Sequence, residues 1–144
     1  MIESEKKFDF IEHTADTGLI AYGRTLPEVF ENAAAGMFSL ICEPDSVTQS
    51  STREIKAHTD DGNPETLLVE WLNELLYIFD VDYFLLGGFH IYNFDNSIIK
   101  AKCSGEAIDL KKHTIKTEIK AATYHMLNIS KDKDTYQAGV IFDV

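Results

Sequence analysis

The stretch TLPEVFENAAAGMFSLI at residues 25–41 decides the first half of the fold. Thr25 supplies a hydroxyl for a helix cap, Pro27 falls in the first turn, and Glu28 follows three residues after the cap. This is the pattern of a capping box at a helix N-terminus. Apolar residues then recur every three or four positions as far as Ile41, which is typical of one helix face. The sequence therefore predicts an amphipathic helix that packs on a sheet.

A second helix is predicted from residue 63 onward. Asn63 is a favourable cap and Pro64 is suited to the first helical position. The apolar face between Leu67 and Phe79 is broad, so we expect this helix to be almost completely buried.

Strand patterns surround both helices. They fall at residues 6–11, 18–23, 53–58, 83–94, 97–105, 116–125 and 135–144. Gly87 and Gly88 indicate a bulge, and residues 132–134 offer turn chemistry. The order of elements predicts an α+β class, with two amphipathic helices on a largely antiparallel β-sheet. The length of 144 residues fits a single domain over 1–144.

The chain is strongly acidic. It carries 24 acidic and 13 basic residues, a formal charge of −11, and arginine only at positions 24 and 53. Nucleic-acid binding depends on neutralising phosphates, so a whole-surface RNA or DNA interface is not expected. A basic protein partner or metal ions suit this charge better. Local basic spots are offered by Lys100 with Lys102, Lys111 with Lys112, and Lys116 with Lys120.

The sequence also bears on the compartment. No apolar run reaches the roughly 18–20 residues of a membrane span, and the first seven residues are mostly polar. We therefore expect a cytoplasmic protein with no membrane association. Cys42 and Cys103 have no metal-site spacing, and two reduced structural thiols are the expected state.

Two acidic positions near the chain ends form a candidate site. The segment EHTADTG at residues 12–18, which contains Asp16, interrupts an apolar opening, and Asp143 stands one residue before the carboxylate of Val144. Asp143 shares its strand face with Ile141, although a chain end can simply be solvated. The other interpretation joins these carboxylates in an oxygen cluster, which selects Ca²⁺, Mg²⁺ or Mn²⁺. Such a cluster needs a cation or a lysine among its charges.

Lys120 is the third candidate. In a strand over 116–125 neither face is clearly apolar, so Lys120 either forms an exposed pair with Glu118 or points toward a polar pocket and holds an anion. His13 lies three residues before Asp16 and fits a hydrogen-bonded turn. The sequence has no nucleophile elbow, phosphate-binding loop or zinc spacing, and therefore no self-contained catalytic set.

Several segments together resemble the archease family, in one order over nearly the whole chain. They are FIEHTAD at 10–16, AYG at 21–23, residues 26–38, WLNELLY at 71–77, GE at 105–106, EIKAATYH at 118–125 and VIFDV at 140–144. Departures from the family pattern are Ala122, Met126, and Tyr136 where a tryptophan is expected near this position.

The resemblance implies an accessory protein that is not itself an enzyme and has no small-molecule substrate. Archeases assist the RtcB-type RNA ligase, which joins 2′,3′-cyclic phosphate or 3′-phosphate ends to 5′-hydroxyl ends in tRNA splicing and RNA repair. They promote GTP-dependent guanylylation of the ligase histidine and multiple turnover. Contact with RNA is then expected only through the ligase.

The resemblance also implies a divalent-metal site, with Ca²⁺ as the expected ion and Mg²⁺ or Mn²⁺ as alternatives. Its ligands fall on Asp16, Asp143 and Val144, and the ligase-activating residues on Lys120, Asp16 and Asp143. Two other interpretations stay open. One is a chaperone-like protein-binding module, and the other is a metal-dependent hydrolase that uses Asp16, His13 and Lys120.

Overall fold

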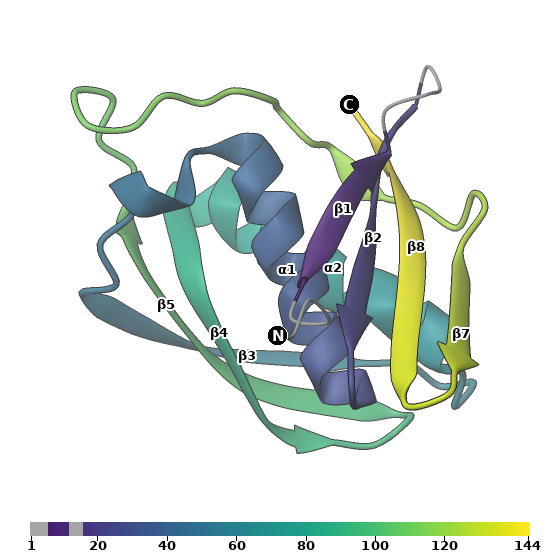
Figure 1. Cartoon of the computed structure of the whole chain (residues 1–144). Coiled ribbons are helices and arrows are strands. Elements are labelled where there is room, and N and C mark those ends of the chain that lie inside the picture. The colour runs from purple at the N-terminus through teal and green to yellow at the C-terminus, as the bar shows by residue number, and fades with distance from the viewer. Residues whose placement is uncertain (1–5, 12–15) are drawn as a thin grey trace.

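The computed structural model describes residues 6–11 and 16–144, which form two helices and eight strands (Figure 1). In chain order they are β1 (Phe8–Ile11), β2 (Thr17–Gly23), α1 (Leu26–Ile41), the 3₁₀ turn η2 (Pro44–Ser46), β3 (Ser51–His58), α2 (Pro64–Asp82), β4 (Phe84–Phe94), β5 (Ile98–Ala107), β6 (Ala121–Ala122), β7 (Asn128–Asp132) and β8 (Thr135–Asp143). The predicted α+β class is confirmed.

Both predicted helix starts are confirmed at atomic level. The Thr25 hydroxyl accepts the N–H of Glu28 over 3.2 Å, and the Glu28 carboxylate reaches back to the N–H of Arg24 over 2.6 Å. At α2 the Asn63 side chain accepts the N–H of Glu65 over 2.8 Å. These contacts satisfy N–H groups that have no partner within the helix.

The strands form two antiparallel sheets rather than the one sheet that we predicted. The first sheet has the order β1-β2-β8-β6, with β7 also paired to β8, and the second has the order β3-β5-β4. The helices lie between the sheets and contact both of them (Figure 1). A second sheet is needed because α2 is apolar around most of its circumference and cannot be covered from one side.

Trp71 ties the two helices together in the core. Its side chain is fully buried, and its indole N–H donates to the carbonyl oxygen of Phe30 on α1 over 2.9 Å. The hydrogen bond satisfies the only polar atom of the largest core side chain. This bond also fixes how α2 packs against α1.

The prediction of a strand over 116–125 is wrong except for the two residues of β6. Ile119 and Ala122 are both buried although they are three residues apart, so the two-residue alternation of a strand is broken. Outside β6, this segment is held by isolated hydrogen bonds to α1, α2 and β8 and not by a strand ladder. The sequence interpretation also missed β7, which is short and mostly exposed.

Smaller predictions are confirmed. The ladder between β4 and β5 shifts register between Leu86 and Gly88, which is the predicted bulge. Asp132 pairs with Thr135 across a two-residue turn in which Lys133 has φ +57°, so the 132–134 run does form a turn. Cys42 and Cys103 are both free and buried.

Over the residues that the structure describes, no helix is long and apolar enough to cross a membrane.

Candidate functional site

The pairing of β2 with β8 brings the two acidic candidates to one end of the first sheet. Thr17 is the partner of Phe142, so Asp16 and Asp143 are each one residue beyond that pair and lie toward the same sheet end. Both residues are exposed, and half of the Asp16 side chain is accessible to solvent. Residues separated by 127 positions in the sequence are therefore neighbours because of strand register alone.

Gly18, two residues after Asp16, lies where β2 and β8 approach each other closely. A Cβ atom at Gly18 would lie 2.6 Å from the carbonyl oxygen of Val140 and 2.8 Å from the side chain of Ile141. Gly18 pairs with Ile141, which is largely buried although it faces away from the helices. Only glycine leaves room for this packing.

Lys120 reaches the same sheet end through its backbone. Its N–H donates to the carbonyl oxygen of Asp143 over 2.7 Å, and the next residue, Ala121, pairs with Asp143. The Lys120 side chain is exposed. The structure thus places three of the predicted site residues, Asp16, Lys120 and Asp143, around one point, with the terminal residue Val144 beside them.

Asn73 of α2 fixes the strand that follows Lys120. Its amide oxygen accepts the N–H of Ala122 over 2.8 Å, and its amide nitrogen donates to the carbonyl oxygen of Ala122 over 3.3 Å. These two bonds satisfy the backbone N–H and carbonyl of Ala122, as a neighbouring strand would. The Asn73 side chain is therefore a second support, beside the pairing with β8, for the residues that follow Lys120.

A histidine that the sequence interpretation left unassigned also faces the site. The Nε2 atom of His125 lies 3.9 Å from the Asp16 carboxylate. No local spacing signals this contact, because it depends on how the chain returns after β6. His13, the histidine that the sequence did associate with Asp16, lies outside the described residues.

The carboxylate oxygens of Asp16 and Asp143 are suitable ligands for a hard cation, since Ca²⁺ and Mg²⁺ prefer carboxylates. Over residues 6–11 and 16–144, however, no group of three or more His, Cys, Asp and Glu side chains is placed to hold a metal ion. The metal site therefore stays a prediction.

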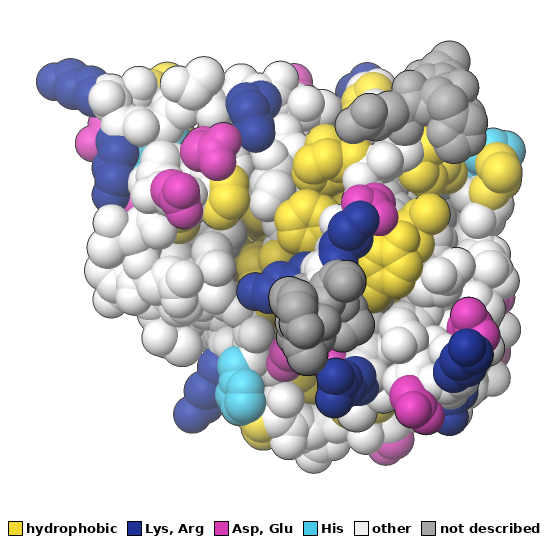
Figure 2. Space-filling model, viewed as in Figure 1, with side chains coloured by type: hydrophobic (Ala, Val, Ile, Leu, Met, Phe, Trp, Pro, Cys, Tyr) yellow, Lys and Arg dark blue, Asp and Glu magenta, His cyan; other side chains and the backbone are white. Residues whose placement is uncertain are grey.

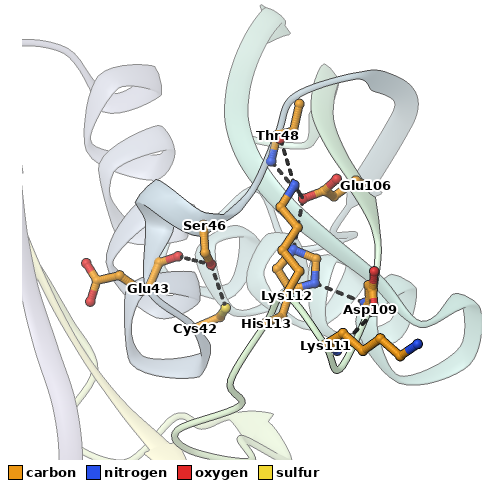
Figure 3. Close-up of polar contacts among 9 residues, drawn as sticks. All are labelled: Cys42, Glu43, Ser46, Thr48, Glu106, Asp109, Lys111, Lys112 and His113. Carbon is orange, nitrogen blue, oxygen red and sulfur yellow. Dashed lines mark hydrogen bonds and ion pairs between the residues drawn. The ribbon is translucent and has the colours of Figure 1, made fainter.

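A second polar cluster, which the sequence did not reveal, anchors the segment that leads to Lys120 (Figure 3). The Glu106 carboxylate at the end of β5 lies 2.8 Å from Nε2 of His113 and 2.7 Å from the ammonium of Lys112, and it accepts the N–H of Thr48 over 2.8 Å. The N–H of Asp109 donates to Nδ1 of His113 over 3.0 Å. We call these residues the Glu106 clasp.

The clasp has a defined electrostatic state. The ammonium of Lys112, then the N–H of Thr48 and the ring N–H of His113, lower the pKa of the Glu106 carboxyl from 4.5 to about 2. Glu106 is therefore ionised at neutral pH. A further hydrogen bond holds the chain after the clasp. In it the N–H of Lys116 donates to the carbonyl oxygen of Ile41 over 2.7 Å.

Comparison with known proteins gives a single answer. The sequence model of the Archease protein family matches residues 8–144. The chain belongs to the archease family. The "Protein archease" of Methanosarcina acetivorans is 42% identical, over 96% of this chain and 97% of the relative. The "Protein archease-like" of Drosophila melanogaster is 37% identical, over 97% of this chain and 92% of the relative.

Solved structures agree with this archease assignment. The solution structure of protein 1598 from Methanobacterium thermoautotrophicum superposes with a TM-score of 0.77 at 35% identity, over 95% of this chain and 98% of that one. A crystal structure from Thermotoga maritima, described as an archease and possible chaperone, has a TM-score of 0.66 at 21% identity, over 93% and 94% of the chains. The second likeness concerns the fold alone.

Within this archease, the segments that carried the resemblance converge in space. The segment with Asp16, the segment with Lys120 and the C-terminal segment with Asp143 meet at one sheet end. The WLNELLY segment contributes Asn73, which holds the second of them, and the Gly105-Glu106 pair contributes the clasp.

Proposed function

We propose that this archease is an accessory protein that activates an RtcB-type RNA ligase, which joins 2′,3′-cyclic phosphate or 3′-phosphate ends to 5′-hydroxyl ends. The observation that carries the proposal is the meeting of Asp16, Lys120 and Asp143 at one end of the β2–β8 pair. An activator needs no catalytic residues of its own, whereas an accessible charged end of a sheet is suited to docking. Family membership supports the same assignment.

In this proposal Asp16, Asp143 and Val144 hold a divalent cation, with Ca²⁺ preferred over Mg²⁺ and Mn²⁺. The three oxygen donors are exposed, so an ion from solvent or from a partner's active site has access to them. The bound ion supplies positive charge that offsets the repulsion among the carboxylates. Exposure of Lys120 leaves its ammonium able to balance the same negative charge or to contact the ligase.

The partner surface follows from charge. A chain of net charge −11 is attracted to the positively charged mouth of an active site that binds RNA and GTP. Once docked, the acidic end positions metal or holds the ligase histidine and GTP in a geometry that favours guanylylation. The RNA itself is contacted through the ligase.

A chaperone-like role is the second candidate. The Thermotoga maritima protein is described as a possible chaperone, and this chain exposes apolar side chains over β1, β2 and β8 (Figure 2). Leu110 and Met126 are each more than 70% exposed. Such side chains can hold unfolded segments of other proteins. Suppression of the aggregation of unrelated proteins distinguishes this role from specific ligase activation.

The deciding experiment is multiple-turnover RNA ligation by the cognate ligase with GTP, with and without this protein. Asp16→Asn, Lys120→Ala and Asp143→Asn are tested beside the wild type. Asp60→Asn and Lys111→Ala, both exposed and outside the first sheet, serve as matched controls. Each variant is first compared with the wild type by circular dichroism and urea unfolding, so that loss of fold is recognised.

Stimulation by the wild type and the controls, together with its loss in the three site variants, supports the proposal. Equal stimulation by all five variants would place the working surface elsewhere on the molecule. Absence of stimulation by the wild type, combined with suppression of aggregation, would favour the chaperone role.

A further inference from the structure

The outer face of the second sheet carries lysines that the proposed function does not use. Lys56 lies on β3, and Lys100 and Lys102 lie on β5. The residues that alternate with them are buried in the core: Ile55, Ala57, Ala101 and Cys103. Successive side chains of a strand point to opposite faces, so the three lysines point away from the helices (Figure 1). This face belongs to a different sheet from Asp16 and Asp143.

Strand register brings these positive charges together. Lys56 is the partner of Lys100 across the ladder, and Lys102 is two residues further along β5. Like charges directly opposite each other destabilise a sheet. Among the described residues, none of the three ammonium groups forms an ion pair, whereas those of Lys112 and Lys116 do. Three neighbouring cations are therefore available to an anion from outside the chain.

The carboxylates around this face do not neutralise the lysines. Glu54 is the register partner of Lys102, and it accepts the hydroxyl of Tyr92 over 2.8 Å. The carboxylates at the rim have partners of their own: Glu31 the N–H of Ile91, Asp60 the ring of His58, Asp95 two N–H groups of the turn between β4 and β5, and Glu106 the clasp. Over the middle of the face, three lysines are opposed by the single carboxylate of Glu54.

An aromatic ring lies among the lysines. Tyr92 falls where the ladder between β4 and β5 shifts register, between Ile91 and Asn93. Its bond to Glu54 carries the side chain across β5, and the ammonium of Lys102 lies 5.9 Å from the centroid of the ring. Tyr92 is nevertheless 49% exposed. An accessible aromatic surface, held at its hydroxyl, therefore lies beside the ammonium groups.

We propose that this face binds a short stretch of single-stranded RNA. The ammonium groups on two adjacent strands bind phosphates, and the Tyr92 ring stacks on a base. An acidic peptide would use the lysines but would leave the ring without a role. The choice of RNA over DNA rests on the ligase activation proposed above, because the substrates of that ligase are RNA ends. The face adds a direct contact with RNA to the contact made through the ligase.

The test is a titration of the intact protein, without any ligase, into a short unstructured RNA that carries a fluorescent label. The comparison probes are DNA of the same sequence and polyglutamate. The expected result is saturable binding of the RNA at low salt. If three phosphates are neutralised, log Kobs should fall with log salt with a slope of about −2. In NMR spectra the amide shifts are expected around Lys56, Lys102 and Tyr92 and not around Asp16.

Variants show whether this face is responsible. Lys100→Gln and Lys102→Gln should each weaken RNA binding severalfold and reduce the salt slope by about 0.7. Tyr92→Ala should weaken binding about tenfold, whereas Tyr92→Phe keeps the ring and should bind almost as the wild type does. Lys111→Gln removes the same charge from an exposed position in the loop after β5 and should leave binding unchanged.

Glu54→Gln provides a test in the opposite direction. The substitution removes the carboxylate beside the lysines but keeps an oxygen that can accept the Tyr92 hydroxyl. RNA binding should become severalfold tighter, a gain that a purely structural role of this face would not produce.

The proposal is overturned if the RNA fails to saturate at low salt and millimolar protein, or if the lysine variants bind it as well as the wild type does. Tighter binding of polyglutamate would also overturn it, in favour of an acidic protein segment. Tighter binding of DNA would overturn the choice of RNA. Because no ligase is present, failure of this binding leaves the proposed activation intact, and failure of the activation leaves this binding measurable.

Discussion

The imidazole of His113 donates its Nε2–H to the carboxylate of Glu106 over 2.8 Å, and the His113 side chain has no exposed surface. The tautomer follows from the opposite side of the ring, where Nδ1 accepts the N–H of Asp109. A neutral imidazole thus bridges a backbone donor and a carboxylate. The contact closes the loop after β5 before the chain turns toward Lys120.

We predict that the Glu106 clasp stabilises the folded protein at pH values at which the Glu106 carboxyl is ionised. Because the folded pKa of Glu106 is about 2 and the ordinary value is 4.5, its contribution is present above about pH 4.5 and is lost as pH falls toward 2. Glu106→Gln should lower the free energy of unfolding at neutral pH, and its difference from the wild type should shrink through this window. Urea unfolding at several pH values measures both effects.

Glu74→Gln, which alters an exposed carboxylate on α2, is the matched control for the clasp. It should track the wild type at every pH. A Glu106→Gln variant as stable as the wild type at neutral pH would show that the clasp contributes nothing to the fold.

We predict that Gly18 and Gly139 differ sharply in their tolerance of alanine, although both lie in the paired strands β2 and β8. A methyl group at Gly18 would meet the carbonyl of Val140, whereas a Cβ at Gly139 has no atom within 4 Å among the described residues, its two chain neighbours aside. Gly18→Ala should cost about 1–3 kcal/mol of stability. Gly139→Ala should change it by less than about 1 kcal/mol. Equal urea midpoints for the two variants would contradict the close approach of the strands.

We predict that Asn73 controls the order of β6. Asn73→Ala removes both hydrogen bonds to Ala122 and should cost about 1–3 kcal/mol. The amide of Ala122 should then exchange with solvent much faster, as measured by hydrogen exchange. Asn93→Ala, at an exposed position of β4, is the control. Unchanged exchange at Ala122 would mean that pairing with β8 is sufficient for β6.

We predict that ligase activation depends on ionic strength. Exposed charges are screened within a few ångströms at high salt, so raising the salt to about 0.5 M should slow the encounter about tenfold or more. The measurement is the dependence of stimulation on the concentration of this protein at each salt level. The ligase without its activator provides the baseline, and an activation that is indifferent to salt would contradict electrostatic steering.

We predict that both thiols are inert in the folded protein. Burial raises the pKa of the Cys103 thiol to about 12, and Cys42 is also buried, so reactive thiolate is scarce and shielded. A maleimide should label neither residue in the native state and both in urea. Rapid native labelling of either position would show that the core opens locally.

Much of the fold could be predicted because the signals are local. A cap at Thr25 and another at Asn63, each followed by a regular apolar face, locate the starts of both helices. The bulge beside Gly88 and the turn at Lys133 follow from residue types alone. Such features depend on the nearest few residues, and the chain carries that information directly.

The remainder depended on contacts between distant segments. Residues around Lys120 looked like a strand, but only Ala121 and Ala122 pair with β8, and the Asn73 side chain bonds Ala122 where a further strand would otherwise pair. The approach of His125 to Asp16 has no local signal either. The division of the strands into two sheets follows from the need to cover α2 on both sides, which no single strand pattern expresses.

By itself, the sequence determined the α+β class, the two capped helices, the acidic character and the residue types of the candidate site, since propensity, periodicity and charge are properties of neighbouring residues. The tertiary structure decided which of those residues meet. The register of β2 on β8 places Asp16 beside Asp143 at one sheet end, and the register of β3 on β5 places Lys56 opposite Lys100. Register is fixed by how the apolar faces pack together, and packing is a property of the whole chain.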